Sequence, residues 1–494
     1  MKKNFRFKRF FATGAWLTAL AVVLIGAACE PQTPQQTTQN TAATNLNANS
    51  AATTNTMPQT VASPEAAKTE ALNLPVTLPV LDAMFADEKF GAELKSKLGL
   101  TDEQIGKLRE TAREATANLN EAESENGSTN AATKNAAEQI SQIIGADKAA
   151  QFNSLISERW AKGGDEADTS GKTVAASDKP NGVPTDTRIV VNAPAYRMDL
   201  FKDGKLVRSY KIGIGYPEFP LPMGIRKAST IIFNPTWTPP DEPWVKGKIK
   251  AGEKVAAGSA LNPLGPIKIP IGSPSLIHGG KALGKLGGFA SHGCVGLTNA
   301  QVQDVAFSFA AITGTPLTGE DMLNYAKNKT ETKNVQLKDA LPVELRYETI
   351  VVEDGKLKIY RDVYERGTNT EANLRKVLEA NGVSLDSLSE PERAKVLDGL
   401  KQMALDAGGN EVETDTNAKK NSSQTVTRNI KGKKEVIIEV AALKGKGYPA
   451  PVDLNTGGKS KPLNLSAATA DAKQTSGNAN QNANANQVTG GKRF

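Results

Sequence analysis

The sequence predicts a multidomain α+β protein in which a β-rich domain lies between an N-terminal and a C-terminal helical segment, joined by disordered linkers. The length of 494 residues allows about two to four domains. Hydrophobic residues make up 39% of the chain and aromatic residues 5%, which is slightly poor in core-forming material, so some segments are expected to bury no core. The spacing of apolar residues changes near residue 187 from a helical period to a strand period.

The first 29 residues predict an export signal. An apolar stretch, Trp16–Ile25, follows a basic start, and the small residues 26–28 precede Cys29. This pattern resembles a bacterial lipoprotein signal, which implies that Cys29 becomes the lipidated first residue and holds the chain on a membrane. Cleavage without lipidation is the alternative. In both cases the mature chain leaves the cytoplasm, and Cys294 is left without a partner if Cys29 is acylated.

Local patterns predict the elements that follow. Thr101 and Gln104 form a capping-box pattern before a run of apolar residues spaced by three and four, which indicates a helix. Arg188–Asn192 has the composition of a strand, and Lys202–Lys205 contains the Asp-Gly pair of a tight hairpin turn. The turn at 353–355 predicts a second hairpin, with strands Val343–Val352 and Lys356–Tyr360.

The composition of successive segments gives the expected domain order. We expect a signal at 1–29, a disordered tether at 30–75, a helical domain at 76–162, a linker at 163–186, a β-rich domain at 187–320, an accessory β-hairpin at 340–366, a helical segment at 371–406, a linker with a lone strand near Val436–Val440 at 407–454, and a disordered tail at 455–494.

The cysteine count, the hydropathy pattern and the net charge exclude several classes of protein. Two cysteines exclude a disulfide-rich scaffold, and the lack of a long apolar run beyond residue 28 excludes a multi-pass membrane protein. The net charge of +7, from 60 basic and 53 acidic residues, is small and scattered, so we expect no nucleic-acid partner.

Both histidines and the non-terminal cysteine lie between residues 278 and 294, as His278, His292 and Cys294. An imidazole beside a thiol can take its proton and return it to a leaving amine, and neighbouring glycines allow substrate and backbone N–H groups to approach closely. Two alternatives stay open on spacing alone. The three residues could bind zinc, with Asn299 or Asp304 as a weak fourth ligand, or Cys294 could be a buried structural thiol.

The strings around these residues resemble the catalytic signature of the L,D-transpeptidases, a His-Gly-type pair followed by Ser/Thr-His-Gly-Cys. Here they read His278-Gly279 and Ser291-His292-Gly293-Cys294. The segments 234–240 and 262–266 resemble loops of the same family. The resemblance covers about residues 187–320 and implies a β-sandwich-like catalytic domain.

The resemblance implies roles for the matching residues. Cys294 is expected to be the nucleophile and His278 the general base, with the Gly279 carbonyl orienting the imidazole. His292 is expected to line the site, and the backbone N–H groups of Gly293 and Cys294 are expected to form the oxyanion hole. The implied substrate is a peptidoglycan tetrapeptide stem, which loses D-alanine, and the implied acceptor is an amine of a neighbouring stem or of a protein. No metal or other cofactor is implied.

One position departs from the family pattern, because Gly296 stands where most members have arginine. Lys281 and Lys285 are nearby cations that could replace it in binding substrate. Ser291 and Trp237 are the other expected substrate contacts. Trp244 and three further aromatic residues could line the same groove, although packing in the core is the alternative for these rings.

The leading hypothesis is therefore an L,D-transpeptidase of the cell envelope, periplasmic and anchored by lipid. A thiol L,D-carboxypeptidase that lets water resolve the thioester is the second hypothesis. A catalytically inactive lipoprotein that binds the cell wall is the third, and Gly296 is the feature that supports it.

Overall fold

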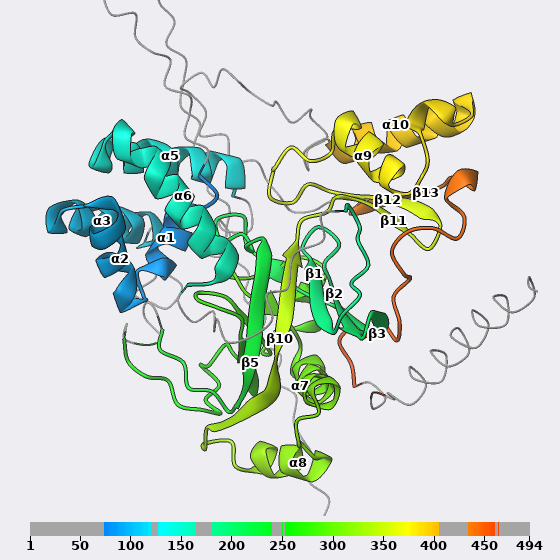
Figure 1. The fold of residues 1–494 in the computed structure, drawn as a ribbon. Helices are drawn as coiled ribbons and strands as arrows, with labels where there is room; N and C mark the ends of the chain where they lie inside the picture. Colours follow the sequence, from blue (N-terminus) through cyan, green and yellow to red (C-terminus); the bar gives the residue numbers. More distant parts are fainter. Residues whose placement is uncertain are drawn as a thin grey trace, which may run out of the picture. The chain divides into compact units, whose positions relative to one another are not determined.

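A computed structural model describes residues 74–117, 119, 127–164, 179–239, 249, 252–404, 433–459 and 463 (Figure 1). The predicted signal, the lipidation site Cys29 and nearly all of the tether and of the C-terminal tail lie outside these residues. Within them, no helix combines the length and the apolar character that crossing a membrane requires.

The N-terminal part is helical, as predicted. Its helices are α1 (Leu78–Met84), α2 (Glu88–Leu98), α3 (Asp102–Ala117), α5 (Thr129–Ile144) and α6 (Ala146–Lys162). The capping box at the start of α3 is confirmed, because the Gln104 N–H donates to Thr101 Oγ1 and the Thr101 N–H donates to Gln104 Oε1, each over 3.1 Å. Phe90, Ile140 and Phe152 are fully buried in the core that these helices share.

The β-rich part contains an eight-stranded sheet with the strand order β3-β2-β1-β10-β5-β6-β7-β9. Its strands are β1 (Arg188–Asn192), β2 (Arg197–Lys202), β3 (Lys205–Lys211), β5 (Gly224–Phe233), β6 (Ile267–Pro270), β7 (Leu276–His278), β9 (Val295–Gly296) and β10 (Lys333–Arg346). The predicted Asp-Gly hairpin joins β2 to β3, and Asp203 (φ 48°) and Gly204 (φ 79°) both adopt the positive φ of such a turn.

The eight-stranded sheet extends beyond the predicted end of the β-rich domain near residue 320. Strand β10 lies in the middle of the sheet, where it pairs with β1 in parallel and with β5 in antiparallel fashion (Figure 1). Val343, predicted to lie in the first strand of the hairpin, instead pairs with Ile189 in this sheet. The first half of β10 is largely exposed and rich in charged residues, so it lacks the apolar pattern that identifies a central strand.

Two helices and a small sheet complete this part. They are α7 (Asn299–Thr313), α8 (Gly319–Lys327) and the parallel pair β4 (Ile214–Gly215) and β8 (Phe289–Ser291). Helix α7 begins with a capping box between Thr298 and Gln301. Val302 and Phe309 of α7 share one core with Leu337 of β10, so the helix packs on the large sheet.

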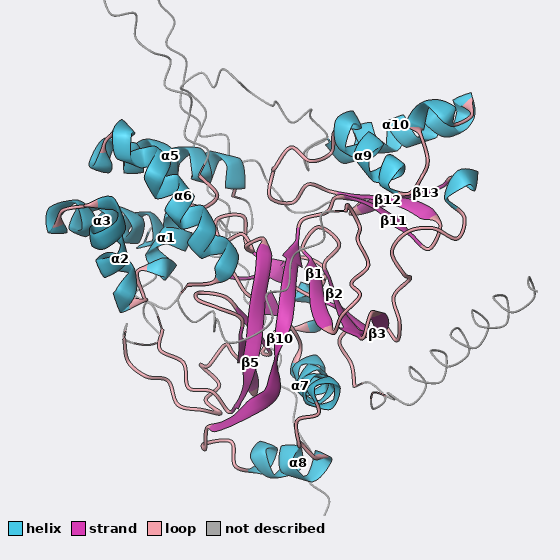
Figure 2. Cartoon of the chain, viewed as in Figure 1, coloured by secondary structure: helices cyan, strands magenta, loops and turns pink. Residues whose placement is uncertain are grey.

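The last described part has its own core. Helices α9 (Glu371–Ala380) and α10 (Glu390–Ala404) pack on the sheet β11-β12-β13, formed by β11 (Ile350–Glu353), β12 (Lys356–Tyr360) and β13 (Glu435–Glu439) (Figure 2). The hairpin turn at 353–355 is present. The strand predicted near Val436–Val440 is β13. It is not a lone strand, because it pairs with β12 along its whole length.

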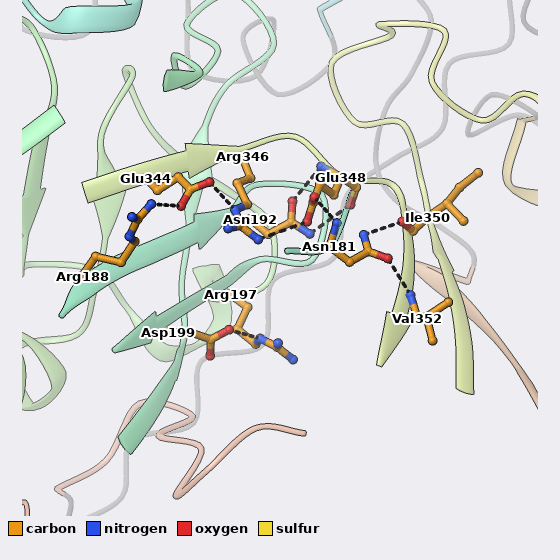
Figure 3. Close-up of polar contacts among 10 residues, drawn as sticks. All are labelled: Asn181, Arg188, Asn192, Arg197, Asp199, Glu344, Arg346, Glu348, Ile350 and Val352. Carbon is orange, nitrogen blue, oxygen red and sulfur yellow. Dashed lines mark hydrogen bonds and ion pairs between the residues drawn. The ribbon is translucent and has the colours of Figure 1, made fainter. Parts of the chain in front are cut away.

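A polar network follows the chain from the end of β10 into β11 (Figure 3). Arg188 and Arg346 both donate to the carboxylate of Glu344, each over 2.8 Å. Burial opposes ionisation of Glu344, but the two guanidinium groups outweigh it and lower the pKa of this carboxyl. Beyond it, Asn181 donates to the Ile350 carbonyl (3.1 Å) and accepts from the Val352 N–H (2.9 Å). Asn181 therefore satisfies backbone groups at the edge of β11.

Candidate active site

The pairing of two short strands places His278 and Cys294 on the same side of the sheet. Strand β7 pairs in parallel with β9, with Ile277 opposite Val295 and His278 opposite Gly296. Ile277 and Val295 are fully buried in the core. Because side chains alternate along a strand, His278 and the residue before Val295, Cys294, face away from that core. Both line one cavity of about 1050 Å³.

The cysteine loop is held by Ser291. The Ser291 hydroxyl donates to the Cys294 carbonyl (2.5 Å) and accepts from the Cys294 N–H (3.0 Å). Gly293 has a φ of 88°, which L side chains rarely adopt, so a glycine suits this position. In this conformation the Cys294 N–H donates to Ser291. The use of the Gly293 and Cys294 N–H groups in the oxyanion hole stays a prediction.

The tautomer of His278 follows from its neighbour. Nδ1 of His278 lies 2.7 Å from the Gly279 carbonyl oxygen. A carbonyl oxygen can only accept, so Nδ1 carries the proton and Nε2 keeps its lone pair. The imidazole can therefore accept a proton through Nε2. The contact is the one expected from the resemblance, and the catalytic role of both residues stays a prediction.

His292 packs among aromatic rings beside the cavity. Its ring meets Tyr216 and Phe219 edge-on, with centroid distances of 5.1 and 4.9 Å. The backbone of Tyr216 donates to the Ser291 carbonyl (2.8 Å), so the segment with these two rings is tied to the cysteine loop. His292 lines the cavity together with both of them.

The predicted substrate contacts divide into two groups. Ser291, Trp237 and Lys281 line the cavity, whereas Lys285 is not among the described residues around it. Lys285 instead lies in a short 3₁₀ helix, η1 (Leu283–Lys285). Trp244, the other tryptophan predicted for the groove, lies outside the described residues. The binding roles of Ser291, Trp237, Lys281 and Lys285 stay predictions.

The space beside Gly296 is filled by Lys281. A Cβ added at Gly296 would lie 2.9 Å from Lys281 Cγ and 3.3 Å from its Cε. The aliphatic stem of Lys281 thus occupies the place where a longer residue 296 would begin. Because Gly296 is opposite His278 in the strand pair, Lys281 lies on the same face of the sheet as the His278 imidazole.

Burial keeps the reacting groups neutral at rest. It lowers the pKa of His278 to about 3, and the nearby Lys281 ammonium lowers it further. The pKa of His292 falls to about 3 for the same two reasons. Burial raises the pKa of the Cys294 thiol, although the Leu276 N–H and Lys281 oppose that rise. At neutral pH Cys294 is thus a thiol and His278 a neutral imidazole.

Two further cations near Cys294 were not predicted from the sequence. Lys268 of β6 pairs with His278 in the sheet and lines the cavity. Arg226 of β5 is 1% exposed, and burial lowers its pKa to about 9. It lies close enough to Cys294 for its charge to lower the pKa of the thiol. The alternation Ile267-Lys268-Ile269 could have indicated that Lys268 faces away from the core. Nothing in the sequence around Arg226 indicates its place.

The zinc alternative lacks its geometry. Among the residues that the structure describes, no three His, Cys, Asp or Glu side chains gather closely enough to hold a metal ion. Both weak fourth ligands are engaged elsewhere. Asp304 pairs with Arg208 over 2.5 Å, and Asn299 Oδ1 accepts from the Gly280 N–H over 2.7 Å.

Comparison with known proteins finds a family model that matches the segment carrying this site. Residues 186–316 match the family model described as the L,D-transpeptidase catalytic domain, YkuD. No curated protein matches the chain.

Solved structures of L,D-transpeptidases are similar to about a third of the chain. The catalytic domain from E. faecium is 19% identical, with a TM-score of 0.22, and the match covers 33% of this chain and 100% of that one. An enzyme from Mycobacterium tuberculosis is 17% identical (TM-score 0.20, 32% of this chain) and one from Mycobacterium smegmatis is 16% identical (TM-score 0.20, 33% of this chain). The chain spans only 57% and 58% of the lengths of these two. Such partial likenesses carry no argument about activity. The family model does relate the segment to a fold: residues 186–316 match the L,D-transpeptidase catalytic domain of the YkuD type.

Proposed function

We propose that this chain is an L,D-transpeptidase that acts on peptidoglycan tetrapeptide stems in the cell envelope, through a thioester on Cys294. The observation that carries the proposal is the β7–β9 pairing, which faces His278 and Cys294 into one cavity. The match of residues 186–316 to the L,D-transpeptidase catalytic domain supports the choice of substrate class.

The acylation step uses the protonation states described above. Cys294 sulfur attacks the carbonyl carbon between the diamino acid and the terminal D-alanine, while the thiol proton passes to His278 Nε2. The oxygen of the tetrahedral intermediate develops negative charge beside the Gly293 N–H. When the C–N bond breaks, the imidazolium returns the proton to the leaving amine, so D-alanine departs and a thioester remains.

The second step regenerates the enzyme. An amine of a neighbouring stem, or of a protein, attacks the thioester carbonyl and gives up a proton to His278. The C–S bond breaks, sulfur takes the proton back, and the new amide bond is the cross-link. A mobile water in the same position would instead release a tripeptide.

The sequence adds a proposal about location. The basic start, the apolar run and Cys29 support export and a lipid anchor. The anchor would keep the catalytic domain beside the cell wall, where the stems are.

The direct test incubates the full chain with disaccharide-tetrapeptide and follows the products by mass spectrometry. We expect release of D-alanine, an acyl adduct on the peptide that contains Cys294, and dimers joined between two diamino residues. Cys294→Ala should abolish all three while leaving the melting temperature within a few degrees. Free tripeptides without dimers would indicate the hydrolase instead. Failure of the folded chain to form an adduct with either the stem or a carbapenem would indicate a non-catalytic wall binder.

A further inference from the structure

One wall of the cavity comes from outside the catalytic domain. Asp82 and Phe85, at the end of α1, and Arg109 and Arg113, on α3, line the same cavity as His278 and Cys294. Arg109 and Arg113 are four residues apart on one helix, so they share a face. The Arg109 guanidinium lies over the ring of Phe85, 5.2 Å from its centroid.

Buried contacts fix this wall against the catalytic domain. Thr77, which is fully buried, donates to the Glu218 carbonyl (2.5 Å), and Thr129 donates to the Pro217 carbonyl (2.7 Å). Residues 217 and 218 lie between Tyr216 and Phe219, the two rings that pack on His292. The helices therefore hold the segment that covers His292.

A second set of contacts lies at the end of α6. Arg226 donates to the Gly272 carbonyl (2.7 Å) and to the Trp160 carbonyl. Gly163 and Gly272 approach so closely that a Cβ on Gly163 would lie 2.8 Å from Gly272 Cα. Backbone packed on backbone allows little sliding of α6 along the segment around Gly272. Because α1 and α3 share one core with α6, they keep a defined place beside the cavity.

The charges around the cavity are unbalanced. Its described lining contains one carboxylate, that of Asp82, and the basic side chains Arg109, Arg113, Lys254, Lys268 and Lys281. A concave surface lined mainly by one sign of charge concentrates ligands of the opposite sign. The guanidinium group also matches the planar geometry of a carboxylate better than an ammonium does.

We propose that Arg109 and Arg113 form an anion-recognition wall, which selects a stem peptide whose carboxylates are free over one whose carboxylates are amidated. This inference rests on the proposed function, since it names the substrate that the same cavity prefers. The stem reaches Cys294 with its carboxylates toward α3. Lys281, whose stem fills the space beside Gly296, supplies a further cation to the same cavity, close enough to His278 to affect its pKa.

The test compares two fragments, a disaccharide-tetrapeptide with free carboxylates and the same fragment with those groups amidated. The rate of acylation is measured for the full chain, for Arg109→Ala/Arg113→Ala, and for Lys107→Ala. Lys107 lies on the same helix but pairs with Glu103 on the exposed surface, so its substitution removes one positive charge from α3 without changing the described lining of the cavity. Arg109→Lys/Arg113→Lys serves as the conservative variant.

We expect the full chain to prefer the free acid by about tenfold or more, and the double alanine variant to lose that preference, mainly through KM. Lys107→Ala should keep it, and the double lysine variant should recover part of it. The preference should also shrink in high salt, because partly exposed charges are screened. A double alanine variant that still prefers the free acid would overturn the inference.

Calorimetric binding in the Cys294→Ala background separates this inference from the proposed function. If the free acid binds there and the two arginine substitutions weaken binding, the wall is an anion site even when no acyl-enzyme forms. If acylation proceeds in the parent chain but binding ignores both arginines, the catalytic proposal stands and the wall is only structural. Failure of the free acid to bind at all would also overturn the inference.

Discussion

At the scale of single residues, the chemistry depends on how far Cys294 and His278 are from their ordinary pKa values. Many thiol enzymes lower the pKa of the thiol to hold a thiolate at rest. Here burial works in the opposite direction on both partners, raising the pKa of Cys294 and lowering that of His278 to about 3. In the proposed mechanism both partners stay neutral at rest, and charge develops only when a carbonyl carbon arrives.

The pH dependence of thiol alkylation tests this resting state. With the thiol pKa raised above its ordinary value, the rate of Cys294 alkylation by iodoacetamide should keep rising through pH 8 and show its inflection above about 9. His278, with its pKa lowered, stays neutral throughout that range and adds no inflection near 6.5. An inflection well below 8, measured by short pulses and mass spectrometry, would show a preformed thiolate–imidazolium pair instead.

His278 and Lys285 provide a matched test of the general base. His278→Ala should lower kcat/KM for tetrapeptide acylation by about 10²- to 10⁴-fold, the range typical for loss of a general base. Lys285→Ala should change it less than threefold, because Lys285 is not among the described residues around the cavity. Equal losses in the two variants would show that the base is misassigned.

At the scale of elements, short strands position the site, and side-chain hydrogen bonds and neighbouring strands fix those short strands in place. The β7–β9 pairing contains only two residue pairs, so its geometry depends on neighbours. Ser291 braces the turn before β9, and β6 pairs with the other edge of β7.

At β11, Asn181 supplies the edge of the strand with the hydrogen bonds that a neighbouring strand would otherwise make.

Removal of the Asn181 side chain should destabilise the chain more than its size suggests. Asn181→Ala leaves the Ile350 carbonyl and the Val352 N–H without their partner and places alanine at a φ of 56°. We expect the free energy of unfolding in urea to fall by about 2–4 kcal/mol. Asn324→Ala, at an exposed position of α8, should change it by less than about 0.5 kcal/mol. An equally small effect at Asn181 would mean that water replaces the amide at no cost.

At the scale of the whole described chain, the helical and catalytic parts meet through a few buried polar contacts. The Thr77 hydroxyl makes two hydrogen bonds. It caps α1 by accepting from the Val80 N–H (3.3 Å), and it donates to the Glu218 carbonyl. A single hydroxyl thus links the start of a helix to the segment that packs on His292.

Substitution of Thr77 should therefore affect the site from a distance. Thr77→Val keeps the shape of the side chain but loses both bonds, and we expect a loss of stability of about 1–2 kcal/mol. Hydrogen exchange should quicken at residues 216–219, whereas Thr77→Ser should behave like the parent chain. If exchange at 216–219 is unchanged while stability falls, the hydroxyl acts only as a helix cap.

The sequence by itself determined the local elements and the reactive residues. The capping box at Thr101, the Asp-Gly turn at 203–204 and helix α7 follow from short-range propensities, which act within a few residues and need no knowledge of the fold. The gathering of His278, His292 and Cys294 was visible because each is rare in this chain.

Only the tertiary structure decided which distant segments meet. The central place of β10, the pairing of β13 with β12 and the use of the Cys294 N–H by Ser291 all depend on contacts that local patterns do not encode. The same holds for Arg109 and Arg113, because the helical pattern of α3 gives no sign that these exposed residues line the same cavity as Cys294. The physical reason is that pairing partners and burial, unlike helix caps and turns, are properties of residues far apart in sequence, and burial is also what sets the pKa values of the reacting groups.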